Sequence, residues 1–301
     1  MELWIALTVA AAFLQNLRSA LQKHLRHGLK TSGASYCRFF YGLPCALVYL
    51  LIVLEVNQAD LPAINFRFLI LVVIGGIAQL IGATLLVHLF SKRNFTVGAT
   101  YSKTETVQTA LFGFLILGDT LSGSAAVGIF LSLFGVMVLS MVSGQVSIRS
   151  LLTAWTGRAA LIGIGIGTGY AIAVVCYRAA SLSLENSYFL VSAGVTLVFA
   201  TVLQTLCMGI FLWVRDKGEL ARVAKAWRVG FLSGLAGALS SACWFSAYTL
   251  QNAAYVSALG QIELVFSFVA SVLMFRERTH LIEILGIGLV ISGLLILVLG
   301  G

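Results

Sequence analysis

The chain has 301 residues, of which 59% are hydrophobic and 10% are charged, and its mean hydropathy is +1.00. A soluble domain of this length carries about a quarter charged residues, so the composition excludes a water-soluble protein. The net charge of +8 would suggest a nucleic-acid partner in a soluble protein, but here the basic residues cluster beside apolar runs. They therefore indicate membrane topology, and no nucleic-acid partner is expected.

Apolar runs of about 20 residues recur from one end of the chain to the other, and a helix of that length spans ~30 Å of hydrocarbon. The longest connection between them, residues 214–227, is too short to form a soluble domain. The sequence therefore predicts an all-α integral multi-pass protein of a plasma (inner) membrane. Ten transmembrane helices are expected, near residues 3–22, 34–54, 68–91, 96–117, 121–143, 159–180, 187–213, 228–250, 254–275 and 280–299.

Lysine and arginine are distributed unequally between the two sides of the predicted membrane. Fourteen of them lie in or beside loops that follow odd-numbered spans, whereas Arg67 and Arg178 lie on the opposite side. Because basic loops stay in the cytoplasm, this bias predicts that both chain termini are outside. The fourteen are Lys23, Arg26, Lys30, Lys92, Arg93, Arg149, Arg158, Arg215, Lys217, Arg222, Lys225, Arg228, Arg276 and Arg278.

The sequence shows no spacing typical of a metal site, a nucleotide-binding loop or a catalytic nucleophile. Its cysteines are scattered inside predicted spans, which favours apolar packing residues over disulfides or metal ligands. The glycine run over residues 163–169 does not follow a strand, so it does not predict a phosphate-binding loop. Hence neither an enzyme nor a cofactor is expected. The cysteines are Cys37, Cys45, Cys176, Cys207 and Cys243.

The sequence contains an internal repeat at a shift of 158 residues, which equals five predicted spans. Because five is odd, the second copy must enter the membrane from the opposite face. The prediction is two inverted five-helix repeats, residues 1–143 and 159–301, joined by a cytoplasmic loop over residues 144–158. Many secondary transporters use such repeats for alternating access. The aligned pairs are Gly76 with Gly234, Asn94 with Asn252, Glu105 with Glu263, Asp119 with Glu277, Gly128 with Gly286, and Gly135 with Gly293.

One aligned pair, Glu105 and Glu263, is predicted at the middle of the bilayer. Each carboxylate lies about nine residues, or ~13 Å, into its span, and the two spans are entered from opposite faces. A charged side chain at that depth costs roughly 2.5–3.5 kcal/mol, so it usually faces a cavity. We expect the pair to bind a substrate amine or to exchange protons. The alternative is a buried contact that fastens two helices.

Other polar side chains accompany Glu105 in its span. Tyr101, Glu105 and Gln108 share one helical face, as residues of a binding cavity do. Lys103 points elsewhere and cannot pair locally with Glu105. It either reaches the cytoplasmic interface or serves as an anion-binding group or a charge partner of another helix. Its repeat counterpart, Gln261, is neutral. Because this polar face occurs in one span of the pair, Glu105 is expected to be the more important carboxylate.

Three further residues complete the predicted substrate-binding set. Trp244 and Tyr248 share a face of the eighth span and would form an aromatic wall, although Tyr248 would also suit an interfacial anchor. Gln79 lies near the middle of the third span, where it would line the cavity. Small residues at four-residue spacing, such as Gly128 and Gly288, are expected to bring helices together, within the chain or in a dimer contact.

Two pairs of stretches carry a family resemblance: "TETV…LILGDT" with "IELV…LMFRERT", and the glycine-rich spans "AAVGIFLSLFGVMVL" and "LIEILGIGLVISGLLIL" that follow them. With the ten spans and the duplication, they resemble the drug/metabolite transporter superfamily, EamA-type. The resemblance covers essentially the whole chain and implies export of metabolites, amino acids or drugs. Many members carry a proline after the repeat glutamate, where this chain has Thr106 and Leu264. Straighter helices are therefore expected here.

The leading functional hypothesis is a secondary transporter, more specifically an exporter, that moves a small polar organic solute by alternating access. Proton or substrate gradients would drive it, because no ATPase domain is evident. The alternatives are a translocase of lipid-linked intermediates (a flippase) and a non-transporting membrane scaffold. The expected partners are a small-molecule substrate, membrane lipids and protons, with the chain as a monomer or homodimer.

Overall fold

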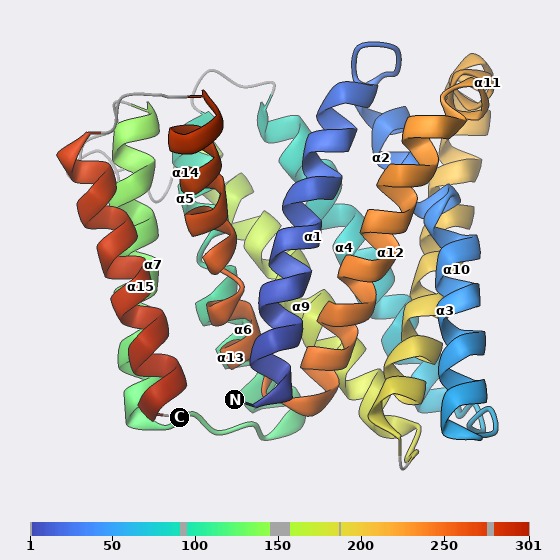
Figure 1. The fold of residues 1–301 in the computed structure, drawn as a ribbon, viewed down its shortest axis with the longest axis horizontal. Helices are drawn as coiled ribbons and strands as arrows, with labels where there is room; N and C mark the ends of the chain where they lie inside the picture. The colour runs from blue at the N-terminus through green and yellow to red at the C-terminus, as the bar shows by residue number, and fades with distance from the viewer. Residues whose placement is uncertain (1, 91–94, 145–156, 187, 276–279, 301) are drawn as a thin grey trace. The chain divides into compact units, whose positions relative to one another are not determined.

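The computed structural model describes residues 2–90, 95–144, 157–186, 188–275 and 280–300, and every regular element in these ranges is a helix (Figure 1). Most of the loop expected over residues 144–158 lies outside the described residues, as do the basic residues Lys92, Arg93, Arg149, Arg276 and Arg278. The helices are α1 (Leu3–Leu25), α2 (Thr31–Phe40), α3 (Gly42–Asn57), α4 (Phe66–Phe90), α5 (Phe95–Ser102), α6 (Glu105–Leu117), α7 (Gly123–Gly144), α9 (Arg158–Ser183), α10 (Phe189–Arg215), α11 (Lys217–Lys225), α12 (Trp227–Leu250), α13 (Ala253–Leu259), α14 (Ile262–Phe275) and α15 (Leu281–Gly300).

Among the described residues, seven helical segments are long and apolar enough to cross a membrane: α1, α2 together with α3, α4, α9, α10, α12 and α15. Large hydrophobic side chains remain exposed along the helices; Leu51, Phe66 and Leu115, for example, are 64%, 78% and 65% exposed. Lipid covers such a surface without penalty, whereas water does not. The chain is therefore an integral multi-pass membrane protein.

Two compact units divide the chain. The first unit comprises Met1–Ile77 and Cys176–Gln251, and the second comprises Ala78–Val175 and Asn252–Gly301. Each unit thus combines a segment from the first half of the sequence with a segment from the second half. Helices α4 and α9 each contribute their two ends to different units. The compact units and the predicted sequence repeats are therefore different divisions of the same chain.

In the first unit, α1 and α12 lie side by side (Figure 1). The hydroxyl of Ser240 donates a hydrogen bond of 2.9 Å to the backbone carbonyl of Ala11. Glycines bring α3 and α12 together, because a Cβ atom on Gly42 would lie 3.3 Å from the carbonyl oxygen of Gly234. Small residues and interhelical hydrogen bonds are what join helices in lipid, where apolar side chains gain little from pairing.

A cluster of charged residues holds α11 against the beginning of α2. The buried carboxylate of Glu219 accepts hydrogen bonds from the backbone N–H of Lys30 (2.7 Å) and from Nε of Arg222 (2.9 Å). Lys30 Nζ also donates to Asp216 at 2.6 Å, and this bond holds the pKa of Asp216 below its ordinary value. A carboxylate with a lowered pKa stabilises the folded state when the pH is above the pKa of the unfolded chain. The contribution of Asp216 is therefore lost as the pH falls through its lowered pKa.

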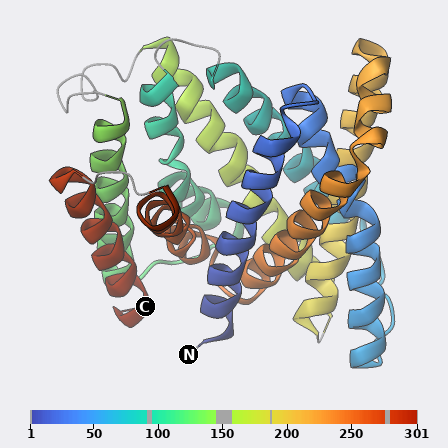
Figure 2. The same ribbon diagram turned by 45° about the horizontal axis from the view of Figure 1, so that its top comes forward.

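In the second unit, α7 and α15 lie side by side in two views (Figures 1 and 2). A Cβ atom on Gly128 would come within 2.6 Å of the carbonyl oxygen of Gly293, and one on Gly135 within 2.8 Å of that of Gly286. The packing role expected for Gly128 is thus confirmed. Gly288 makes no such contact within the chain, because nothing lies within 4 Å of the position that a Cβ atom would take there, and its alternative role in a dimer contact stays a prediction. Glycines two turns apart on α15 make the contact instead.

Candidate functional site

The two segments that carry the repeat glutamates are interrupted helices, and both belong to the second unit. Lys103 and Thr104 separate α5 from α6, while Gly260 and Gln261 separate α13 from α14. The expectation of straighter helices in the absence of proline is therefore wrong. Under the shift that aligns the repeats, the two interruptions coincide to within one residue.

At the first interruption, hydrogen bonds to the third preceding residue replace the usual bonds to the fourth. The backbone N–H of Lys103 donates to the carbonyl of Thr100, and that of Thr104 to the carbonyl of Tyr101, both at 3.1 Å. The Thr104 hydroxyl donates to the same Tyr101 carbonyl at 2.6 Å. The Tyr101 carbonyl thus accepts both a backbone and a side-chain donor, and the helix is interrupted here without proline.

The second interruption has the same kind of bonding. The backbone N–H of Gln261 donates to the carbonyl of Ala258 at 3.0 Å, and that of Glu263 donates to the carbonyl of Gly260 at 3.1 Å. Both chain segments thus pass through one tight turn and then resume a helix.

Each repeat glutamate lies in the first turn of the helix that follows its interruption. Glu105 is the first residue of α6, and Glu263 is the second residue of α14. The N-terminal turn of a helix carries unpaired N–H groups and the positive end of the helix dipole. The interruptions therefore place both carboxylates where a negative charge is stabilised by the backbone.

An ion pair connects the two interruptions. Lys103 Nζ lies 2.9 Å from Glu263 Oε1, and the two side chains are 28% and 22% exposed. The charge of Lys103 also acts on Glu105. Lys103 is thus a charge partner for another helix, which was one of the alternatives left open. The cluster holds two carboxylates and one ammonium group, so it carries an excess negative charge when all three are ionised.

Gln261 joins the same two chain segments and leaves an acceptor open. Its Nε2 donates a 3.3 Å hydrogen bond to the hydroxyl of Thr106. Its Oε1 is buried and accepts no hydrogen bond from the described residues. A buried acceptor in this state costs about 1–3 kcal/mol unless a ligand or water supplies a donor. The Gln261 Oε1 atom can therefore accept a hydrogen bond from one N–H or O–H donor.

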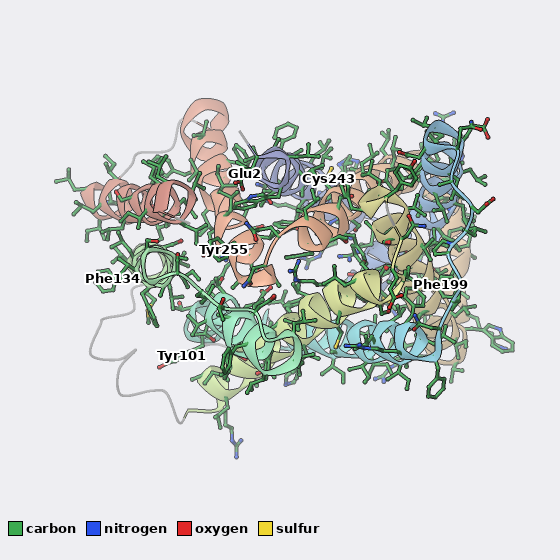
Figure 3. The ribbon with its side chains drawn as sticks, turned by 90° about the horizontal axis from the view of Figure 1, so that it is seen from below. Glu2, Tyr101, Phe134, Phe199, Cys243 and Tyr255 are labelled. Atoms are coloured by element: carbon green, nitrogen blue, oxygen red, sulfur yellow. The ribbon has the colours of Figure 1, made fainter. Side chains whose placement is uncertain are left out.

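Gln108 lies beyond the first interruption and bonds to α9 and to the turn. Its Oε1 accepts from the Thr168 hydroxyl at 2.6 Å, and its Nε2 donates to the Thr104 hydroxyl at 2.9 Å. Tyr101 is in the last turn of α5, before the interruption (Figure 3). The continuous face expected for Tyr101, Glu105 and Gln108 is therefore wrong, because the turn divides these residues between two helices.

The glycine run over residues 163–169 makes room for the first interruption. A Cβ atom on Gly163 would lie 2.1 Å from the carbonyl oxygen of Gly98 in α5, and one on Gly167 would lie 3.1 Å from the backbone nitrogen of Glu105. Gly169 faces α4 instead. The run thus has a packing role, since it lets the backbone of α9 approach the turn that carries the charged cluster.

Gly163→Ala is expected to lower the melting temperature of the purified protein by several degrees, because overpacking costs about 1–3 kcal/mol and the facing atom is backbone. Gly165→Ala is the matched control on the same helix: its Cβ would meet Leu85 Cδ1 at 3.4 Å, an ordinary contact. Thermal unfolding in detergent measures both variants. Equal melting temperatures for the two would show that α9 does not approach α5 as described.

Two aromatic residues of the predicted site, Trp244 and Tyr248, belong to the first unit. The rings of Trp244 and Tyr248 stack with centroids 5.7 Å apart, and the Trp244 indole donates to Gln15 at 3.2 Å. Tyr248 is 8% exposed, so its side chain is buried within the protein and does not serve as an interfacial anchor. Gln79 is half-buried on α4 in the second unit. The predicted site residues are thus divided between the two units, and the charged cluster lies in the second.

Two half-buried arginines of the first unit, Arg18 and Arg38, pack against α12, whereas their positions in the sequence predict side chains that reach the cytoplasmic ends of their helices. Side-chain atoms of Arg18 and Arg38 lie 3.3 and 3.6 Å from the position that a Cβ atom on Gly237 would take. Gly237 is near the middle of α12, so two guanidinium-bearing side chains pass the centre of a candidate span. A glycine on a third helix makes room for them, and no pattern within one helix reveals such a contact.

Comparisons with known proteins agree with this description. The model of the EamA-like transporter family matches residues 2–141 and 157–299. A solved structure described as "Crystal structure of protein" has a TM-score of 0.69 and 13% sequence identity, over 98% of this chain and 96% of that one, which shows a shared fold. The search of curated proteins finds no match. Because the family model matches nearly the whole chain in two stretches, the chain belongs to the EamA-like transporter family, within the drug/metabolite transporter superfamily.

Proposed function

We propose that the chain is a secondary transporter that exports a small polar organic solute, such as a metabolite, an amino acid or a drug, in exchange for protons. Membership of a transporter family supports movement of a molecule across the membrane. The observation that carries the finer proposal is the cluster of Lys103, Glu105 and Glu263 at the two helix interruptions.

The charges of this cluster suggest how a solute and a proton compete. Lys103 neutralises one carboxylate, which leaves the other to be neutralised by a proton or by a cationic group of the solute. An uncompensated charge inside a membrane costs several kcal/mol, so an empty, unprotonated site is unfavourable. Binding of the solute therefore releases a proton, and binding of a proton releases the solute. The open acceptor of Gln261 suits an N–H donor on the same solute.

The proposed architecture has ten spans in two inverted five-helix repeats, residues 1–143 and 159–301. It adds three spans to the seven long apolar segments: α5 with α6, α7, and α13 with α14. About ten residues, or ~15 Å of helix, precede each repeat glutamate, which suits a site at the middle of the bilayer. Interrupted helices at the midplane are common in transporters with inverted repeats. Both termini are proposed to be outside the plasma (inner) membrane, following the bias of basic loops.

The other predicted site residues keep proposed roles in substrate binding. Tyr101, Gln108 and Gln79 are candidates for lining the path in the second unit. Trp244 and Tyr248, stacked in the first unit, are candidates for an aromatic contact with the solute.

Reconstituted vesicles test the proposal. The purified chain is placed in liposomes filled with a defined mixture of amino acids, amines and other small metabolites, and mass spectrometry follows their loss under an acidic-outside pH gradient. Selective loss of a soluble cationic or zwitterionic compound, absent from protein-free liposomes, is expected. Movement of a lipid-linked sugar without solute loss would support the flippase alternative, and movement of neither would support the scaffold.

A further inference from the structure

A shallow basic groove lies at the end of the first unit where α1 ends and α12 begins. Its volume is about 650 Å³, and no acidic side chain lines it. The charged lining side chains are Arg222, Lys225 and Arg228, and the imidazoles of His24 and His27 stand beside them. All five come from segments that the distribution of basic residues assigns to the cytoplasmic side.

Of the three cations that line the groove, one is held in an ion pair and two remain exposed. Arg222 is committed to Glu219, which its Nε reaches at 2.9 Å. Lys225 and Arg228 are exposed, and the guanidinium carbon of Arg228 lies 5.5 Å from the ring centroid of Trp227. The face of an aromatic ring attracts a cation, and at an exposed site the cation keeps most of its hydration. The groove thus offers positioned positive charge to an anion.

The aromatic residues show at what depth the groove lies. Trp227, the first residue of the candidate span α12, is 57% exposed, and Trp213, in the last turn of the candidate span α10, is 58% exposed. The ammonium group of Lys217 lies 5.3 Å from the Trp213 ring centroid. Exposed tryptophans at the ends of spans mark the level of the lipid headgroups. The groove is therefore at the height of phosphate groups in the membrane.

An apolar surface continues from the groove along α12. Phe231, four residues after Trp227 and so on the same helical face, is 43% exposed, and the neighbouring Leu232 is 52% exposed. A phospholipid could place its phosphate in the groove and its acyl chains along this surface, so one molecule would match both the positive charge and the apolar face. We propose that the groove binds the headgroup of an anionic phospholipid of the cytoplasmic leaflet, with its acyl chains along α12.

Native mass spectrometry of the purified full chain tests this site with phosphatidylglycerol as the probe. Wild type is expected to retain phosphatidylglycerol over phosphatidylcholine. The double variant Lys225→Gln, Arg228→Gln is expected to bind it roughly tenfold more weakly, since each basic residue near a membrane surface contributes an attraction to anionic lipid. The matched control is Lys23→Gln, Arg26→Gln, which removes the same charge from exposed residues outside the groove lining and is expected to change retention little.

Three outcomes would overturn the proposal. Equal retention of phosphatidylcholine would show that the groove does not distinguish an anionic headgroup from a zwitterionic one. An equal loss in the control variant would show a diffuse attraction to basic loops instead of a site. Displacement of the lipid by millimolar inorganic phosphate or glycerol 3-phosphate would show that the groove is a site for soluble anions. The test is independent of transport, so it stands whether or not the proposed proton exchange is correct.

Discussion

Transport by Glu105→Gln is expected to lose its dependence on the pH gradient while the variant remains folded. Glutamine keeps the shape of the side chain but cannot take up or release a proton. In the wild type, a gradient of one pH unit stores about 1.4 kcal/mol per proton, enough for roughly tenfold accumulation of an exchanged solute. In the variant this accumulation should disappear, and the remaining flux should follow the solute gradient alone.

The matched control for this variant is Glu283→Gln. Glu283 also lies in the first turn of a helix, α15, where it accepts a 3.0 Å hydrogen bond from the backbone N–H of His280. It has no place in the charged cluster, so its variant should accumulate solute as the wild type does. If Glu105→Gln also accumulates solute under a pH gradient, at equal amounts of reconstituted protein, Glu105 is a packing residue and the proposed site is wrong.

Removing the ammonium group of the cluster is expected to have the largest effect on stability. Lys103→Met leaves two partly buried carboxylates without a cation inside the membrane, and breaking such a pair costs up to about 3–5 kcal/mol, the value for a fully buried pair. In a chain of this size that corresponds to a fall in melting temperature of roughly 5–15 °C. Glu263→Gln should cost less, because Glu105 remains near Lys103. The double variant Lys103→Met, Glu263→Gln should recover much of the loss, since a single unpaired carboxylate remains.

Thermal unfolding of the purified variants in detergent measures this cycle. The exposed pair of Lys30 and Asp216 provides the comparison, because an ion pair open to water contributes little and Lys30→Gln should melt close to wild type. Strictly additive losses for Lys103→Met and Glu263→Gln would contradict the coupling inferred from the 2.9 Å contact.

Hydrophobic patterning located the long helices well, because each must bury a complete apolar stretch in lipid. The span expected at residues 228–250 is α12 (Trp227–Leu250), and that at 280–299 is α15 (Leu281–Gly300). The same patterning could not show that residues 96–117 form two helices. A turn of two residues hardly changes the average over a window of about 20, and that average does not register a local bond such as the one from the Thr104 hydroxyl to the Tyr101 carbonyl.

The sequence singles out the residues of the charged cluster but does not predict how they bond to one another. The unusual cost of charge in a membrane singles out Glu105, Glu263 and Lys103 from the sequence alone. The sequence could not show the partner of Lys103, because Glu263 lies 160 positions away on a helix in the other half of the chain. The expected helical face failed for a related reason: spacing along a helix has meaning only while the helix is continuous, and it ends at Ser102.

Substrate-driven proton movement in reconstituted vesicles directly tests the exchange of solute for protons at Glu105. The vesicles enclose a pH-sensitive dye, and the solute identified in the efflux experiment is added outside with no initial pH gradient. The entering solute is expected to drive protons out, so that the interior becomes more alkaline with wild-type protein and stays unchanged with Glu105→Gln. Solute entry into wild-type vesicles with no change in internal pH would contradict proton exchange at this site.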